Sequence, residues 1–182
     1  MGKQNNKSDF VFQSITLIGI GLIGSSIARA VKKRNDLVQT VTLTDVNAEV
    51  RQKAKEIGLG DHVLDDVTIA VKDADCVILC TPIGNYAEIM QNISNHLKSG
   101  CIVSDVGSVK RAPIADMSPH IPDGVHLVPG HPIAGTEKSG PESGFAELFE
   151  GRYWLLTPGL ETARNATQRM RNLFEGIGAM VE

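Results

Sequence analysis

One histidine of the chain stands in a segment whose composition suits catalysis. His131 lies between Gly130 and Pro132, shortly after an apolar run that is predicted to be a strand. Oxidation of an alcohol needs a base that takes the hydroxyl proton, and an imidazole has an ordinary pKa of about 6.5. A lone histidine is often structural, but a Gly- and Pro-flanked loop at a strand end favours a base. We therefore predict His131 as the catalytic base, with Ser108, at another strand end, beside it.

A glycine-rich turn is predicted to hold a dinucleotide. It follows a predicted strand, opens a predicted helix and consists of Gly19, Ile20, Gly21, Leu22, Ile23 and Gly24. The first glycine permits the tight turn, the second lets the backbone approach a pyrophosphate, and the third allows close packing of helix on strand. The phosphates would then meet the free N–H groups and the positive end of the helix dipole. The alternative is an ordinary surface turn that happens to be rich in glycine.

An acidic residue follows the glycine turn at the distance expected of a ribose-binding carboxylate. Asp45 lies 45 − 24 = 21 residues after Gly24, at the end of the next predicted strand. A carboxylate at about this spacing accepts hydrogen bonds from the ribose hydroxyls and repels a 2′-phosphate. The sequence therefore predicts NAD rather than NADP as cofactor. The alternative role for Asp45 is that of a helix cap.

Two further strand ends are predicted to line the cofactor crevice. Thr81, Pro82 and Ile83 follow the most apolar predicted strand, and Asp105 and Gly107 precede Ser108 after the next one. In an open parallel sheet, ligands bind outside the carboxyl ends of the strands. We therefore expect these five residues to contact the cofactor, although Pro82 could equally be a simple helix-start residue.

The elements that must position these residues alternate along the chain. Strands are predicted at residues 15–20, 40–44, 62–64, 76–80, 102–104, 126–128 and 153–157, and helices at 22–34, 48–57, 86–97, 110–117 and 161–177. This alternation predicts an α/β protein with a Rossmann-type, doubly wound, mostly parallel sheet. Residues 1–14 are predicted to be a flexible tail, and residues 15–182 a dinucleotide-binding domain that is truncated at its C-terminal end, where a further strand begins. Residues 129–151 are predicted to be a long irregular loop.

Composition excludes several classes of protein. The chain has 42% hydrophobic and 21% charged residues and a net charge of −3, which is typical of a globular protein. Its basic residues are scattered, so neither nucleic acid nor an anionic membrane is expected as a partner. The apolar segment Ile15–Val31 contains glycines, serines and Arg29, and is therefore a poor membrane span. The three cysteines are expected to be reduced thiols of a cytoplasmic protein, and no metal site is predicted.

Three motifs together resemble the prephenate/arogenate dehydrogenase family of tyrosine biosynthesis. They are the glycine turn followed by Ser25-Ser26, the segment Asp105-Val106-Gly107-Ser108-Val109-Lys110, and the segment Gly130-His131-Pro132-Ile133-Ala134-Gly135-Thr136-Glu137. The first motif occurs in many dehydrogenases, whereas the other two in this order are far more specific. The resemblance runs from Ile15 to the end of the chain.

The resemblance implies a reaction and roles for individual residues. The reaction is the NAD-dependent oxidative decarboxylation of prephenate to 4-hydroxyphenylpyruvate, of arogenate to tyrosine, or of both. It implies that His131 is the base, that Ser108 binds the same substrate hydroxyl, and that Thr136 and Glu137 lie at the substrate pocket. Members of the family carry a helical C-terminal domain that forms a homodimer and contributes to the substrate site. That domain is absent from these 182 residues, so the isolated chain is expected to turn over poorly.

Two alternative functions remain compatible with the glycine turn. One is another NAD-dependent enzyme such as a hydroxyacid dehydrogenase, which would leave the Gly-His-Pro segment unexplained. The other is a non-catalytic NAD-binding module, because a fold does not fix a function. The second alternative predicts that the chain binds NAD and that substitution of His131 or Ser108 has no effect on its function.

Overall fold

The central element of the molecule is a parallel sheet of six strands. The computed structural model describes residues 10–182. Its strands follow the order β3-β2-β1-β4-β5-β6, and every neighbouring pair is parallel. They are β1 (Phe12–Ile18), β2 (Val38–Thr44), β3 (His62–Leu64), β4 (Cys76–Leu79), β5 (Ile102–Asp105) and β6 (His126–Leu127). The strand order reverses between β1 and β4, which creates the crevice where α/β sheets bind their ligands.

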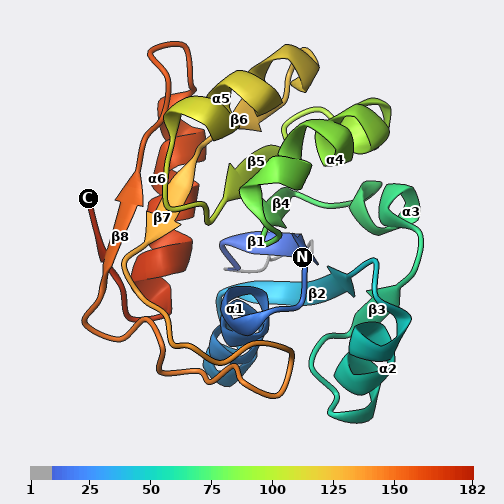
Figure 1. Cartoon of the computed structure of the whole chain (residues 1–182). Helices are drawn as coiled ribbons and strands as arrows, with labels where there is room; N and C mark the ends of the chain where they lie inside the picture. Colours follow the sequence, from blue (N-terminus) through green and yellow to red (C-terminus); the bar gives the residue numbers. More distant parts are fainter. Residues whose placement is uncertain (1–9) are drawn as a thin grey trace, which may run out of the picture.

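Helices cover both faces of this sheet (Figure 1). They are α1 (Leu22–Arg34), α2 (Ala48–Glu56), α3 (Val67–Val71), α4 (Tyr86–Ile93), α5 (Arg111–Met117) and α6 (Arg164–Gly176), with short 3-10 turns η1 (Ile83–Asn85), η2 (Ser94–His96) and η3 (Ser118–His120). Neighbouring strand residues point to opposite faces: Leu17 packs in the core that includes α1 and α6, and Ile18 packs in the core that includes α4 and α5. The predicted doubly wound α/β fold is therefore confirmed.

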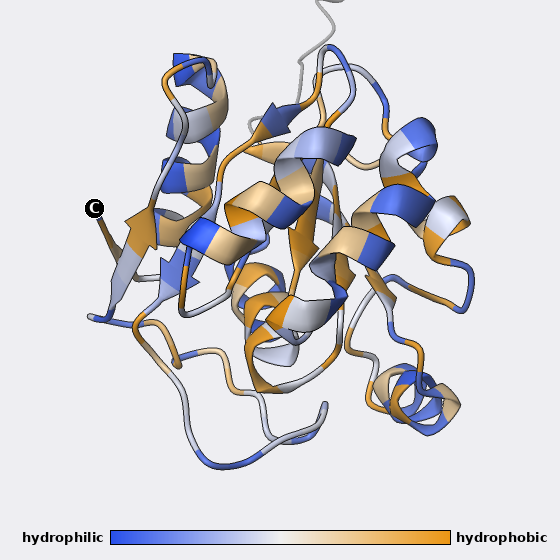
Figure 2. Ribbon diagram, turned by 45° about the horizontal axis from the view of Figure 1, so that its top comes forward, coloured by the Kyte–Doolittle hydropathy of each residue, from blue (hydrophilic) through white to orange (hydrophobic). Residues whose placement is uncertain are grey.

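The sequence pattern of the strands follows from this double cover. All four residues of β4 are buried, and the ribbon coloured by hydropathy shows the strands apolar between the helices (Figure 2). A strand with two covered faces needs apolar residues at consecutive positions instead of alternating ones. No helix in residues 10–182 is long and apolar enough to cross a membrane.

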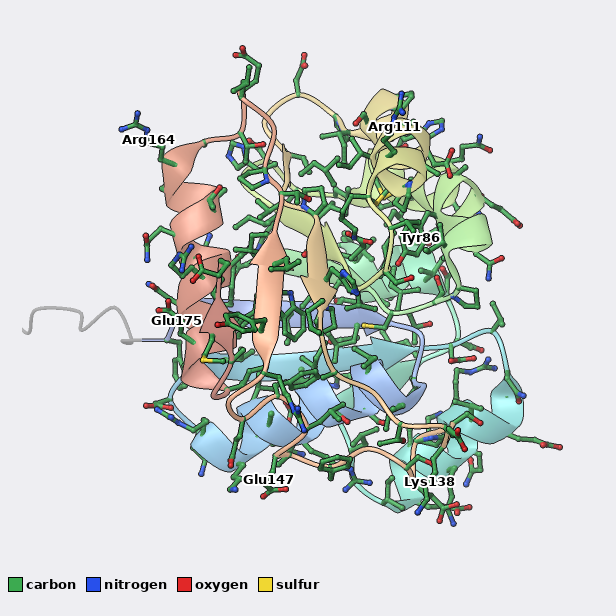
Figure 3. All side chains as sticks on the ribbon, turned by 60° about the vertical axis from the view of Figure 1, so that its left-hand side comes forward. Tyr86, Arg111, Lys138, Glu147, Arg164 and Glu175 are labelled. Atoms are coloured by element: carbon green, nitrogen blue, oxygen red, sulfur yellow. The ribbon has the colours of Figure 1, made fainter. Side chains whose placement is uncertain are left out.

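A second, small sheet stands beside the first and was only partly predicted. It contains β7 (Gly130–Pro132), β8 (Tyr153–Leu156) and β9 (Met180–Val181), with β7 antiparallel and β9 parallel to β8. Trp154 anchors it, because its buried ring stacks on Phe174 of α6 at 3.7 Å between ring centroids. Figure 3 shows β7 and β8 side by side against α6. The prediction of an irregular loop at residues 129–151 is thus wrong near its start, where residues 130–132 form β7.

The outer face of this small sheet includes the candidate base. His131 is in register with Leu155, and Tyr153 is in register with Met180. Tyr153, Leu155 and Met180 are exposed large hydrophobic residues. His131 therefore lies at one edge of an apolar face instead of in a loop.

The predicted tail extended too far into the chain. β1 begins at Phe12, which is fully buried beneath the guanidinium of Arg169. Asp75 accepts hydrogen bonds from the backbone N–H groups of Gln13 and Ser14. Because Gln13 and Ser14 are polar, the sequence pattern did not indicate that the strand begins before Ile15. Residues 10–14 thus belong to the ordered structure, and residues 1–9 of the predicted tail lie outside the described residues.

Candidate active site

The glycine turn joins β1 to α1 at the reversal point of the sheet. Gly19 has φ +98°, and a Cβ atom there would lie 2.9 Å from the backbone carbonyl of Cys80. A Cβ atom on Gly24 would lie 2.2 Å from the carbonyl oxygen of Gly19, whereas one on Gly21 would meet no atom of the described part of the chain within 4 Å. The two outer glycines therefore serve the turn and its packing, and Gly21 leaves open space in front of the backbone.

The N-terminus of α1 offers unoccupied backbone donors. Gly21 is its N-cap, no side chain within residues 10–182 caps it, and its first turn carries no acidic residue. Such an end has free N–H groups and the positive end of the helix dipole, which together favour an anion. Leu22 and Ile23 are partly buried in this first turn, and the Ile20 side chain is fully buried in the core. The predicted six-residue motif therefore contributes backbone groups rather than side chains.

Asp45 is tied to the glycine turn. Its Oδ2 accepts a hydrogen bond of 2.8 Å from the N–H of Ile20, and its Oδ1 accepts one of 2.9 Å from the N–H of Asn47. A carboxylate has about four acceptor positions, so two remain for hydroxyl groups of a ligand. Arg51 donates to the carbonyl oxygens of Asp45 and Val46 and fixes the loop after β2.

A cleft of about 460 Å³ lies at these strand ends. Gly19, Gly21, Asp45, Thr81 and Pro82 are the predicted residues that line it. The hydroxyl oxygen of Thr81 is buried without a hydrogen-bond partner among the described residues. Buried polar groups are normally hydrogen-bonded, so this hydroxyl is a candidate to bind a ligand. The predicted contacts from three separate strand ends are thus brought to one cavity.

Other lining residues were missed by the sequence analysis. They come from the loops after β2 and β3, from η1 and from α3 and α4, namely Val46, Asp65, Val67, Asn85, Glu88, Ile89 and Asn92. Val46 is fully exposed, which is unusual for a hydrophobic side chain. The only signal in the sequence is that these residues lie in segments that follow predicted strands, a property they share with many residues that have no role.

Outside the glycine turn, three predicted cofactor residues do not line this cleft, namely Ile83, Asp105 and Gly107, and within the turn Ile20, Leu22, Ile23 and Gly24 do not line it either. The carboxylate of Asp105 is fully buried, and accepts from the Gly107 N–H at 2.9 Å, Lys110 Nζ at 2.5 Å and the Gly130 N–H at 3.1 Å. A Cβ atom on Gly107 would lie 3.0 Å from the side chain of Ile83, so these two residues pack on each other. The prediction that Asp105 contacts the cofactor is therefore corrected: its oxygens are occupied by its own chain.

The buried carboxylate instead joins the two candidate catalytic segments. The loop that carries the exposed Ser108 folds around Asp105 through Gly107 and Lys110. The strand that carries His131 begins at Gly130, which bonds both Asp105 and Lys110. Burial, followed by the positive charge of Lys110, lowers the pKa of the partly buried His131 below its ordinary value, while Asp105 opposes this effect. His131 is consequently neutral at pH 7 and able to accept a proton.

The predicted substrate residues Thr136 and Glu137 lie on the loop between β7 and β8. Both are exposed, and Thr136 lines a separate hollow of about 460 Å³ together with Ile133 and Arg152. This loop crosses α1, where Phe145 donates its N–H to the hydroxyl of Ser26. In Figure 3 the labelled Lys138 and Glu147 of this loop lie near α1 and α2, away from Tyr86 and Arg111.

The geometry can be compared with known proteins. Residues 27–182 match the family described as prephenate dehydrogenase, nucleotide-binding domain. The chain belongs to this family. It is 42% identical to cyclohexadienyl dehydrogenase of Zymomonas mobilis over 171 residues, which are 94% of this chain and 58% of the relative. The resemblance seen in the three sequence motifs is thereby confirmed.

Solved structures agree with this assignment of family and fold. Prephenate dehydrogenase of Aquifex aeolicus, in complex with hydroxyphenyl propionate and NAD⁺, superposes with a TM-score of 0.85 at 30% identity and covers 93% of this chain. Arogenate dehydrogenase of Synechocystis gives the same TM-score at 28% identity. The chain spans 59% of each of these two proteins.

Proposed function

We propose that this chain is the cofactor-binding part of an NAD-dependent dehydrogenase that oxidatively decarboxylates prephenate, arogenate or both. The observation that carries the proposal is the cleft at the strand reversal, where the uncapped N-terminus of α1 faces the open space at Gly21 beside Asp45. Membership of the prephenate dehydrogenase family supports the reaction, and relatives named for each substrate support both possibilities.

The residues of the cleft fit NAD. The free N–H groups of α1 would hold the pyrophosphate, and the two free acceptor positions of Asp45 would bind ribose hydroxyls. Asp65 and Glu88 add further carboxylates to the lining. This negative charge disfavours the 2′-phosphate of NADP. Thr81 Oγ1, buried without a partner among the described residues, would gain one from the cofactor.

His131 and Ser108 are proposed as the catalytic residues. NAD, when bound, supplies the acceptor for a hydride from the substrate ring. The neutral imidazole of His131 takes the proton of the ring hydroxyl, Ser108 hydrogen-bonds the same oxygen, and the electron pair of the ring carboxylate bond restores aromaticity as CO₂ leaves. Removal of the proton by a positioned base typically accelerates such a reaction 10²- to 10⁴-fold or thereabouts, on the order of 3–5 kcal/mol.

The remaining assignments follow from the family and stay proposals. Thr136 and Glu137 would lie at the substrate pocket, on the loop that is anchored to α1. The length of the relatives beyond the matched part leaves room for a helical domain that completes the substrate site and forms a homodimer. The exposed apolar residues Tyr153, Leu155 and Met180 beside His131 support a covering domain on this side of the site.

The experiment that tests the proposal is NADH formation by the full-length gene product with prephenate and with arogenate in parallel, and by this 182-residue chain beside it. We expect NADH with at least one substrate from the full-length product and much less from the chain alone. Absence of NADH with both substrates, while NAD still binds, would withdraw the roles given to His131 and Ser108.

A further inference from the structure

A buried ion pair lies directly behind the candidate base. Lys110 Nζ is 2.5 Å from Asp105 Oδ2, and the two side chains are 16% and 0% exposed. A buried carboxylate is strongly destabilising unless it is paired and hydrogen-bonded. Lys110 and two backbone N–H groups provide those partners here. The pair stands where β5 meets the small sheet, and the reaction proposed above gives it no role.

This ion pair binds both backbone polar groups of Gly130, its N–H and its carbonyl oxygen. The N–H of Gly130 donates to Asp105 Oδ1 at 3.1 Å, and the carbonyl oxygen of Gly130 accepts from Lys110 Nζ at 2.5 Å. A Cβ atom on Gly130 would lie 2.8 Å from Trp154 Nε1 and 3.0 Å from the carbonyl oxygen of Asp105. Glycine is therefore required for the approach, and the residue immediately before His131 has little freedom to move.

The same carboxylate shapes the loop of the second catalytic residue. Asp105 Oδ2 accepts from the Gly107 N–H and from Lys110, which flank Ser108 in the sequence. Ser108 itself is exposed at the tip of this loop. One ion pair thus fixes the backbone on both sides of the proposed hydroxyl-binding pair, Ser108 and His131.

We propose that Lys110 is a positioning residue, which locks the Ser108 loop to the start of β7 and places a positive charge beside His131. The proposal rests on the proposed function for its catalytic meaning, but its geometry and its electrostatic effect belong to this chain alone. Among the described residues, Lys110 and Asp105 are the charged groups that shift the pKa of His131, and they act in opposite directions. Loss of Lys110 would leave the carboxylate uncompensated, and the imidazole would then hold a proton at higher pH.

The decisive measurement is the pKa of His131 by NMR titration of this chain labelled at its histidines, with the signal assigned through His131→Asn. In Lys110→Met we expect this pKa to rise by about one pH unit. Lys110→Arg keeps the charge and should keep the pKa close to that of the wild type. Lys72→Met removes an exposed lysine elsewhere and should leave the pKa unchanged.

A second variant protects the test against misfolding. Asp105→Asn combined with Lys110→Met removes both charges, so no buried charge is left unpaired, and we expect a His131 pKa between those of the wild type and Lys110→Met. An unchanged His131 pKa in folded Lys110→Met, or an equal rise in Lys110→Arg, would overturn the proposal. These readouts need no turnover, so failure of the proposed reaction would be seen separately.

In the full-length enzyme we expect the same variants to change the pH dependence of kcat/KM. The acid limb of kcat/KM should move up with the His131 pKa in Lys110→Met, and kcat should fall about tenfold or more while KM for NAD stays within about twofold. Lys110→Arg should restore the pH profile. If kcat/KM fell equally at all pH values and the pH of its acid limb did not change, Lys110 would only stabilise the fold.

Discussion

At the scale of single residues, the account depends on His131 and Asp45, which serve different ligands. His131 is partly buried at the edge of an apolar sheet face, and its lowered pKa keeps it neutral at pH 7. Asp45 faces the cleft and bonds the glycine turn. Substitution of the two should therefore separate catalysis from cofactor choice.

His131→Asn should keep the affinity for NAD and lose most of the turnover. The amide cannot accept a proton near neutral pH, so we expect kcat of the full-length enzyme to fall by roughly 10²- to 10⁴-fold. Steady-state kinetics with calorimetric titration of NAD measures both quantities. Unchanged turnover would remove His131 from the mechanism, and lost NAD binding would place it in the cofactor site.

Asp45→Asn should reduce the preference for NAD over NADP by about tenfold or more, since a hydrogen bond to a charged group contributes roughly 1.5–3 kcal/mol. The amide oxygen can still accept from Ile20, so the turn should remain intact. Asp45→Ala removes that acceptor as well and serves as the comparison. The two affinities are measured by titration, and an unchanged ratio in both variants would contradict the role of Asp45.

At the scale of elements, the turn between β1 and α1 contains two glycines, Gly21 and Gly24, whose substitution by alanine should have different effects on stability. Gly21→Ala should leave the melting temperature unchanged, because a Cβ atom there meets nothing within 4 Å. The methyl group would stand in the space proposed for the pyrophosphate, and we expect NAD to bind about tenfold more weakly, equivalent to about 1.4 kcal/mol.

Gly24→Ala is the matched variant in the same turn. Its Cβ atom would lie 2.2 Å from the carbonyl oxygen of Gly19, so both the melting temperature and NAD binding should fall. Thermal unfolding with and without NAD distinguishes the two variants. If Gly21→Ala lowered stability as much as Gly24→Ala, the open space assigned to the ligand would be part of the packing.

At the scale of the whole molecule, two sheets share one core around α1 and α6. Phe12, at the start of β1, is fully buried in this core. Phe12→Ala should lower the free energy of unfolding by about 3–5 kcal/mol in urea denaturation. Leu160→Ala, which removes a fully exposed side chain, should change it by less than about 0.5 kcal/mol. A small effect at Phe12 would mean that the strand begins later, as the sequence first indicated.

The sequence predicted the large sheet well because each strand and helix carries its own periodic pattern. The helix Leu22–Arg34 and the strand His62–Leu64 occur within the predicted bounds. β7 was missed because Gly130 and Pro132 are typical of loops, and it becomes a strand only by pairing with β8. Asp105 was misassigned because spacing places a residue at a strand end without showing which way its side chain turns. Lys110 lies in the segment Asp105–Lys110, but its partner Gly130 is 20 residues away, so the sequence pattern could not join the two.

The most direct test of the central claim is calorimetric titration of this 182-residue chain with NAD and with NADP. The account predicts that NAD binds at one site, that NADP binds at least about tenfold more weakly, and that Gly21→Ala reduces the binding of both. A chain that folds but does not bind NAD, or that binds both dinucleotides equally, would contradict the assignment of the cleft at Gly19–Gly24 and Asp45 as the cofactor site.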